Sequence, residues 1–308
     1  MGVEVVKVKE IDGGMRLNRW FLKYYPGLSL SKFNKLLRTK QIKVDGTKAE
    51  ASLKLKVGQE IRVPPLDAEK AVFKNEGVSA KDEEFIRSLV IYKDDNIIVI
   101  NKPSGLAVQG GTNTKRHIDD MLGGLKFNLQ EAPKLVHRID KDTSGVLVLA
   151  RNRKNAEMLT SAFKEKKLNK TYLALVRGVP KVREGEIKAP LDKIGEKMEV
   201  LAEGKKAITK YRVLDTIGNR FALIEASPVT GRTHQIRAHL EYIGCPIVGD
   251  DKYFGDKREH LKEFANKLFL HAYKIDLSGI YNRKQVITAS LPEHFENALG
   301  FLGLICKG

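Results

Sequence analysis

The sequence predicts an α+β protein of two domains, a small one at the N-terminus and a larger one after it. Three observations support this prediction. The chain has 308 residues, enough for two separate hydrophobic cores. Its first 65 residues show two short helical patterns and then strand patterns, and most of the rest consists of short apolar runs bounded by turn residues. Segments with helical spacing are fewer than strand-like runs, and no repeat of fixed period occurs.

The N-terminal segment is predicted to begin with two short helices. Residues 16–22 carry an apolar stripe between basic residues, and Pro26-Gly27 is expected to stop this first helix. Ser31 is the predicted N-cap of a second helix over residues 32–38, whose basic side chains face solvent.

A hairpin and a linker are predicted to follow. Residues 42–44 alternate apolar and polar side chains and run into Asp45-Gly46, a strong hairpin-turn signal. Residues 60–63 supply a closing strand. The charged stretch 66–87 is predicted to be a linker, so the second domain would cover residues 88–308.

The second domain is expected to contain more strand than helix. Its apolar or β-rich runs predict strands at 97–100, 145–150, 172–176 and 221–224. Residues 156–165 show helical spacing of apolar side chains.

Basic residues exceed acidic residues by a wide margin. The chain holds 55 Lys and Arg against 38 Asp and Glu, a formal net charge of +17. Residues 1–65 contain 14 basic and 6 acidic residues, so this short segment carries nearly half of the excess. A positive field of this size attracts polyanions, which makes nucleic acid the leading partner class. A basic surface that serves solubility alone is the open alternative.

Several other classes of protein are disfavoured. With 42% hydrophobic and 30% charged residues, the composition is that of a globular protein rather than a disordered one. Cys245 and Cys306 are isolated, which argues against a disulfide scaffold or a zinc site and favours the cytoplasm. The sequence shows no signal peptide, membrane span or glycine-rich phosphate loop. No metal is expected, and structural roles are predicted for His137, His234, His239 and His271.

The most informative stretch is HRIDKDTSGVLVLAR, residues 137–151. A cluster of His, Arg, two Asp, Thr and Ser stands directly before an apolar run that is predicted to be a buried strand. A rigid strand can hold such polar residues in the geometry that catalysis needs. From the residues alone, a catalytic site and a capped turn entering a core strand are equally good interpretations.

Four motifs of the chain resemble those of the RluA-type pseudouridine synthases, in the same order. HRIDKDTSGVLVLAR is similar to the catalytic motif of that family, and NKPSGLAV at 101–108 is similar to its upstream Lys-Pro-x-Gly motif. KTYLA at 170–174 resembles the segment with the active-site Tyr, and PVTGRTHQIRAH at 228–239 resembles the downstream Thr-Gly-Arg motif. The resemblance covers residues 88–308. It implies a mixed, mostly antiparallel sheet, the pseudouridine synthase fold.

The N-terminal segment resembles a second family, the S4 RNA-binding domains, through its helix, helix, hairpin order and its basic residues. This resemblance covers residues 15–65, so an S4-like domain is expected over residues 1–65. Its basic side chains are expected to contact RNA phosphates, namely Lys32, Lys35, Arg38 and Lys43. The open alternative is an ordinary small domain with a charged, solvated surface.

The resemblance also implies roles for residues of the larger domain. Asp140 would be the essential carboxylate, and Tyr172 would stack on the displaced uracil and serve as a general base. Arg138 would reach into the RNA to support a flipped nucleotide, and Arg232 would bind RNA. Arg237 is expected to keep Asp140 charged and oriented through two parallel hydrogen bonds. A surface phosphate contact stays open for Arg237, and a core position for Tyr172.

The implied reaction needs no cofactor. Pseudouridine formation breaks the C1′–N1 bond, turns the uracil and joins C5 to C1′, with no redox change. A carboxylate beside the anomeric carbon can stabilise positive charge or bond to the sugar, as in retaining glycosidases, or it can steer proton removal from C2′. The sequence does not choose between these routes. A stacked uridine must also be extruded from the RNA to reach such a group.

We expect an isomerase that acts on large-subunit ribosomal RNA, as RluC-like members of the family do. The S4-like segment, Ala189-Pro190-Leu191 and residues 227–231 favour that branch, although RluD-like members share much of the architecture. The alternatives are a pseudouridine synthase that acts on transfer RNA and a non-catalytic RNA-binding or ribosome-associated protein. The expected partner is ribosomal RNA or its assembly precursor, with no membrane, and a cytoplasmic monomer is expected.

Overall fold

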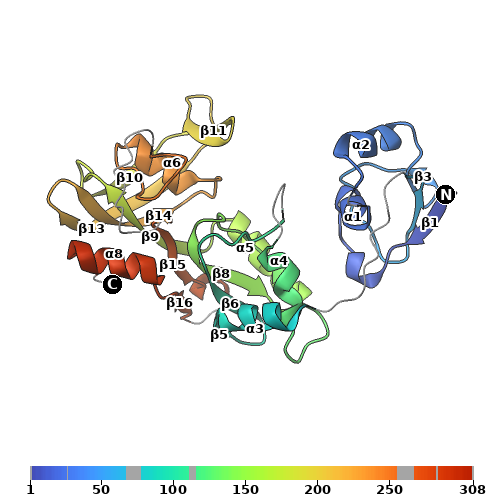
Figure 1. Ribbon diagram of the computed structural model, residues 1–308, viewed down its shortest axis with the longest axis horizontal. Coiled ribbons are helices and arrows are strands. Elements are labelled where there is room, and N and C mark those ends of the chain that lie inside the picture. Colours follow the sequence, from blue (N-terminus) through green and yellow to red (C-terminus); the bar gives the residue numbers. More distant parts are fainter. Residues whose placement is uncertain are drawn as a thin grey trace. The chain divides into compact units, whose positions relative to one another are not determined.

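The chain is divided into two compact units, Met1–Glu76 and Gly77–Gly308, each with its own core. The computed structural model describes residues 2–25, 27–66, 78–110, 116–254, 267–281 and 284–306. Figure 1 shows the smaller unit in blue and the larger one in cyan to red. No helix within the described ranges is long and apolar enough to cross a membrane.

The smaller unit combines two helices with a four-stranded antiparallel sheet of order β1-β4-β2-β3. Its elements are β1 (Glu4–Lys7), η1 (Glu10–Asp12), α1 (Leu17–Tyr24), α2 (Leu30–Arg38), β2 (Lys43–Val44), β3 (Thr47–Lys48) and β4 (Glu60–Val63). Aromatic side chains of the helices, Trp20, Phe21 and Phe33, form one core with Ile42 and Ile61. The predicted helix, helix, hairpin order is confirmed.

The turn of the hairpin has the backbone that its residues favour. Asp45 and Gly46 have φ values of 48° and 73°, as a two-residue hairpin turn requires. The Asp45 carboxylate accepts a hydrogen bond of 2.8 Å from the Glu60 N–H, which ties the turn to β4. The predicted turn is therefore confirmed.

The N-cap of α2 differs from the prediction. Ser29, not Ser31, has the extended backbone of a cap, and its Oγ accepts a hydrogen bond of 3.2 Å from the Lys32 N–H. Leu28 and Phe33, which flank this cap, are both buried in the same core, and the burial of both fixes where the helix begins. The predicted cap at Ser31 is wrong for this reason. The expected stop at Pro26 lies outside the described residues.

The larger unit is built on a ten-stranded sheet whose main path is β10-β13-β14-β9-β15-β8-β6-β5. All its described pairings are antiparallel except that of β15 with β8, so the predicted mixed, mostly antiparallel sheet is confirmed. The strands are β5 (Val90–Lys93), β6 (Ile97–Lys102), β7 (Lys134–Leu135), β8 (Ser144–Ala150), β9 (Asn169–Arg177), β10 (Glu184–Lys188), β13 (Ile208–Ile217), β14 (Phe221–Pro228), β15 (Leu270–Asp276) and β16 (Val286–Thr288). A separate hairpin joins β11 (Leu191–Ile194) to β12 (Lys197–Val200).

Helices border this sheet on both sides. They are α3 (Ala80–Ser88), α4 (Ile118–Met121), η2 (Leu122–Leu125), α5 (Arg153–Lys164), α6 (Gln235–Tyr242), α7 (Ser278–Tyr281) and α8 (Glu293–Leu302). Figure 1 shows α3, α4 and α5 beside the green strands and α6 and α8 beside the brown strands, with the two halves meeting where β15 adjoins β8.

Strand β8 is buried along its whole length because both of its faces are covered. Leu147 and Leu149 pack into a cluster with residues of α3 and α4, whereas Val146 and Val148 pack into a cluster with residues of α5. A strand covered on both faces has apolar residues at every position, which explains the continuous apolar run in the sequence.

The predicted linker is too long at its C-terminal end. Residues 80–88 form α3, with Ser79 as its N-cap, and Ile86 is fully buried in the core of the larger unit. The linker assignment is therefore wrong for residues 80–87, because the surface charges of this helix concealed its single core residue. Residues 67–77 lie outside the described part of the chain.

Candidate active site

Asp140 lies in the segment that leads into β8. The start of this strand is fixed against β15, because Gly145 pairs with Ala272 in the parallel ladder. Gly145 has a φ of 109°, and a Cβ at this position would collide with the Ala272 backbone, so only glycine allows the approach. The polar segment before β8 is thereby held at a fixed place on the sheet.

Lys102 holds this segment in place through hydrogen bonds to the backbone. The side chain is fully buried, and its Nζ donates hydrogen bonds of 2.8 Å to the backbone oxygens of Pro103, Leu106 and Lys141. Burial lowers the pKa of Lys102 to about 7. Because Lys141 is adjacent to Asp140, this amine joins the loop of the NKPSG motif to the loop that carries the carboxylate.

Tyr172 and Lys170 project from the same face of β9, since side chains two residues apart in a strand point the same way. Burial raises the pKa of Tyr172 above its usual value, and the negative charge of Asp140 raises it further. Burial lowers the pKa of the Lys170 amine. The surroundings of both side chains therefore disfavour an uncompensated charge, whether on the amine or on the phenol.

Gln235 organises the loop between β14 and α6. Its Oε1 accepts hydrogen bonds of 2.6 Å from the Thr230 hydroxyl and 3.1 Å from the Arg232 N–H, and its Nε2 donates to the Thr209 hydroxyl at 3.0 Å. The same hydroxyl is 2.8 Å from Nδ1 of His239, which is fully buried. Each group of Gln235 thus has a partner, which rigidifies the loop.

Arg237 is held by Asp250, a residue that no sequence motif marks. Its Nε and Nη2 donate hydrogen bonds of 2.7 Å to the Asp250 carboxylate, which also accepts from the N–H groups of Lys252 and Tyr253. Arg237 Nη1 lies 4.0 Å from Asp140 Oδ2. The predicted two-bond pairing with Asp140 is therefore wrong. Asp250 is fully buried while 30% of the Asp140 side chain is exposed, so the Asp250 partner is desolvated and fixed.

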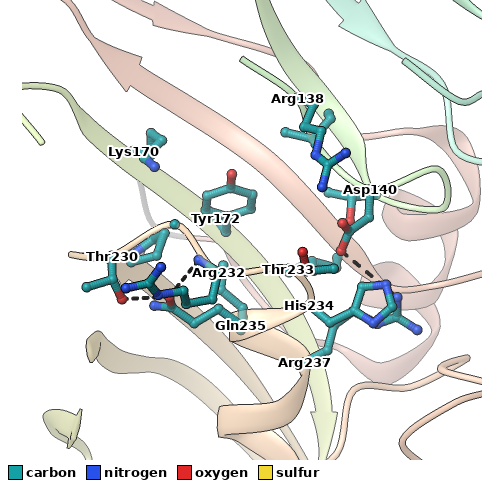
Figure 2. A pocket seen from close by; sticks show the side chains of 16 residues that line it. Arg138, Asp140, Lys170, Tyr172, Thr230, Arg232, Thr233, His234, Gln235 and Arg237 are labelled. Atoms are coloured by element: carbon teal, nitrogen blue, oxygen red, sulfur yellow. Dashed lines mark hydrogen bonds and ion pairs between the residues drawn. The ribbon is translucent and has the colours of Figure 1, made fainter. Parts of the chain in front are cut away.

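Asp140, Lys170, Tyr172, Gln235 and Arg237 line one cavity of about 140 Å³ (Figure 2). Five of the predicted catalytic or RNA-binding residues lie along it, namely Arg138, Asp140, Tyr172, Arg232 and Arg237. Arg138 and Arg232 are exposed at its edge. The other predicted RNA-binding residues belong to the smaller unit, in which Lys32, Lys35 and Arg38 are exposed on α2 and Lys43 is half-buried on β2.

The four histidines named from the sequence each have a protein partner. His137 Nε2 accepts from the Val148 N–H at 2.9 Å, and burial lowers the pKa of His137 to about 3. His234 Nδ1 lies 3.1 Å from the Tyr253 hydroxyl. His239 and His271 are fully buried and hydrogen-bonded through both ring nitrogens. Within the described residues, no group of three His, Cys, Asp or Glu side chains could hold a metal ion.

Known proteins resemble this chain over most of its length. The RNA pseudouridylate synthase family matches residues 96–242. The ribosomal large subunit pseudouridine synthase C of Rickettsia conorii is 40% identical over 296 residues, which cover 92% of this chain and 96% of that protein. The chain belongs to the RNA pseudouridylate synthase family. The enzyme of the same description from Vibrio cholerae is 35% identical over 307 residues, with 96% of each chain covered.

A solved structure supports the same conclusion. Human RNA pseudouridylate synthase domain containing 4 is 29% identical, with a TM-score of 0.64, and the match covers 74% of this chain and 99% of that one. The protein is thus an RNA pseudouridine synthase, an isomerase. Its family membership decides against the alternative of a non-catalytic RNA-binding protein.

Three residues of the synthase site were not predicted from the sequence. Asp250 follows Arg237 by thirteen positions in a stretch without a recognised motif, and only its place before the aromatic Tyr253 sets it apart. Lys102 and Lys170 stand inside motifs in which other residues were expected to carry the function. The feature that could have identified them is a lysine at the end of an apolar strand. An amine is buried at such a position only if it has a partner or a ligand.

Proposed function

We propose that this synthase isomerises uridines in large-subunit ribosomal RNA, with the Asp140 carboxylate acting at C1′ of the target nucleotide. One observation carries the proposal, namely the cavity that joins Asp140 to Tyr172 and Arg237. The names of the relatives from Rickettsia conorii and Vibrio cholerae, both ribosomal large subunit pseudouridine synthases, support the substrate.

The geometry of the cavity supports a division of roles. A carboxylate that is only partly exposed can approach the anomeric carbon and stabilise positive charge there or bond to it. Tyr172 offers a ring on which the detached uracil can stack, whereas burial raises the pKa of its phenol and so disfavours the phenolate that the expected general base would need. Arg237 directs one guanidinium nitrogen at Asp140, so its positive charge faces the carboxylate and can hold it in place.

The edge of the cavity suits an extruded nucleotide. Arg138 and Arg232 are exposed there, and long cationic side chains can contact phosphates and stack on bases. Arg138 would fill the space that the flipped uridine leaves. The exposed cations of α2 would bind RNA phosphates in an S4-like manner and so place the substrate.

The proposed reaction uses no cofactor, since the isomerisation has no redox step and the carboxylate supplies the covalent or electrostatic catalysis. Cys245 and Cys306 are free thiols, as is usual for proteins of a reducing compartment. We accordingly propose a cytoplasmic enzyme that acts as a monomer on ribosomal RNA or its assembly precursor.

The test compares two RNA substrates. The purified protein should form pseudouridine in protein-free large-subunit ribosomal RNA, as mapped by carbodiimide modification and primer extension. Asp140→Asn should form none. Asp95→Asn, which removes an equivalent charge from the exposed turn between β5 and β6, should retain full activity. Modification of transfer RNA with ribosomal RNA left untouched would overturn the proposed substrate and favour the transfer-RNA alternative.

A further inference from the structure

Lys170 is a polar group of the cavity that the roles above leave unused. Its side chain lines the cavity from the middle of the sheet, two residues before Tyr172 on β9. Within the part of the chain that the structure describes, no hydrogen bond or ion pair joins its amine to the protein. A desolvated amine without a protein partner is costly, so such a group is expected to have a ligand.

Arg237 and Arg232 differ from Lys170 because each has a protein partner, and Arg138 differs because it is exposed. Arg237 is neutralised by Asp250, and the Nε of Arg232 donates to the Lys206 backbone oxygen at 3.3 Å. Arg138 and Arg232 are exposed at the edge, where phosphates can reach them without entering the cavity. Lys170 is half-buried, so its amine can contact only a part of the nucleotide that enters the cavity.

The position of Lys170 indicates which part that is. Figure 2 shows Tyr172 between Lys170 and Asp140, and strand geometry puts the Cα atoms of Lys170 and Tyr172 about 7 Å apart. Asp140 acts on the pKa of Tyr172, whereas burial alone lowers the pKa of Lys170. A uracil stacked on Tyr172 with its glycosidic bond at Asp140 therefore extends its opposite edge toward Lys170.

We propose, on the basis of the function inferred above, that the Lys170 ammonium is a further catalytic group of this synthase. It binds the uracil carbonyl oxygen opposite the glycosidic bond and stabilises the uracil anion while the base is detached. The ammonium thus has the same relation to the leaving base that an oxyanion hole has to a tetrahedral intermediate.

The chemistry of the base explains why one donor suffices. When the C1′–N1 bond breaks, its electron pair stays with N1 and spreads over O2 and O4. The ring then turns about the axis through N3 and C6, which exchanges N1 with C5 and C4 with C2. O2 consequently arrives where O4 had been. C5 bonds to C1′ and loses its proton to a base, and N1 takes up a proton. Because the ring has turned, one amine contacts O4 in the substrate and O2 in the product. This holds whether the sugar bonds to Asp140 or passes through a glycal, because the base leaves as an anion in both routes.

The first test separates chemistry from binding. Lys170→Met keeps the length of the side chain and removes its charge, and Lys170→Arg keeps the charge. At saturating enzyme, single turnover by Lys170→Met should fall about 100-fold, the typical loss for one such donor. Lys170→Arg should recover part of the rate, and RNA affinity should stay within about twofold. Lys210→Met, which removes an exposed strand lysine paired with Glu186 at 3.5 Å, should be unaffected.

The stability of the variant guards against a folding artefact. Removing an unpartnered, half-buried amine relieves its desolvation, so Lys170→Met should melt about 2 to 4 °C above the wild type while being slower. A methionine variant that is both slower and less stable would point to a structural role and would overturn the proposal.

A changed leaving group tests the assigned contact. Fluorine at C5 stabilises the uracil anion, so an RNA with 5-fluorouridine at the target should depend less on Lys170 for cleavage of the C1′–N1 bond. The penalty of Lys170→Met should shrink at least fivefold on this substrate. Equal penalties on both substrates would overturn the proposal. An unchanged rate with a lower salt dependence of binding would instead assign Lys170 to a phosphate and would also overturn it.

These results remain distinct from a failure of the proposed function. The comparison uses an RNA that the wild type modifies, and failure of the proposed function would show in the wild type and in Asp140→Asn. Failure of this inference would show only in the Lys170 variants.

Discussion

Arg237 makes its two-bond ion pair with Asp250, and its remaining guanidinium nitrogen lies 4.0 Å from Asp140. The pair with Asp250 fixes the plane of the guanidinium, so the nitrogen that faces Asp140 has little freedom to turn away. The centroid of the Tyr253 ring lies 5.1 Å from the guanidinium carbon of Arg237, so this ring also restrains the guanidinium. Asp250 is therefore a positioning residue that acts on Asp140 through Arg237.

This relationship predicts the behaviour of Asp250→Asn. The amide keeps the volume but cannot form the charged pair, so Arg237 stays buried without its counter-ion and loses its fixed direction. We expect the free energy of unfolding to fall by about 3 kcal/mol, the lower end of the cost of breaking a buried pair. Single turnover should fall about tenfold to 100-fold through misplacement of the guanidinium. Urea denaturation and single-turnover assays measure the two effects. A folded variant with the wild-type rate would show that Asp250 does not position Arg237 for catalysis.

The sequence predicted the parts of the site that are local along the chain. Asp140 stands four residues before β8, and a strand buried on both faces has a distinctive apolar run, so the strand and the polar cluster before it were visible together. The Asp45-Gly46 turn was predicted for a similar reason, because its backbone conformation is a local preference of those residues.

The partner of Arg237 could not be predicted because it depends on tertiary structure. Asp140 and Asp250 are both near Arg237, and only burial decides which carboxylate makes the two-bond pair. Helix α6 was missed for another reason. It begins after His234, which has a φ of 49° and makes no side-chain cap, so the usual start signal is absent. The apolar spacing of Ile236 and Leu240 was the remaining signal.

Stability should depend on pH through the buried His271. Because Nε2 lies 3.3 Å from the Ala289 oxygen, it carries the proton, and Nδ1 accepts from the Ser144 hydroxyl at 2.9 Å. Burial lowers the pKa of His271 to about 4. Between about pH 6.5 and pH 4 the unfolded chain binds a proton that the folded protein does not, so stability falls as the pH falls.

The loss assigned to His271 is about 2 kcal/mol between pH 7 and pH 5. Paired carboxylates also lose stability on acidification, so the informative quantity is the difference from His271→Asn, which lacks this proton. Urea unfolding at both pH values should show a smaller acid loss in the variant, by about 2 kcal/mol. Equal losses in the two proteins would contradict the assigned pKa.

The exposed cations of α2 should contribute to RNA binding without affecting the chemical step. Replacing Lys32, Lys35 and Arg38 with Gln removes three charges from one helix face while their core neighbours Phe33 and Leu36 remain. The slope of log affinity against log salt should fall by about 2 to 3, since each phosphate contact releases counter-ions. Single turnover at saturating enzyme should be unchanged. An undiminished slope, measured by filter binding between low and moderate salt, would place the RNA elsewhere.

The last prediction concerns the order of two losses at the centre of the cavity. Asp140→Asn should abolish isomerisation and leave RNA affinity nearly intact, because the amide keeps the size and polarity of the side chain but cannot act as an anionic nucleophile or stabilise an oxocarbenium-like centre. Arg237→Leu should slow turnover less completely, because the carboxylate remains while its orientation is freed. The leucine also leaves the Asp250 charge buried without its partner, so its rate must be read on folded protein. Single-turnover assays at saturating enzyme report the chemical step alone. Substantial turnover by Asp140→Asn, free of wild-type protein, would show that Asp140 is not part of the mechanism. If Arg237→Leu were as inactive as Asp140→Asn, the guanidinium would take part in the chemical step itself.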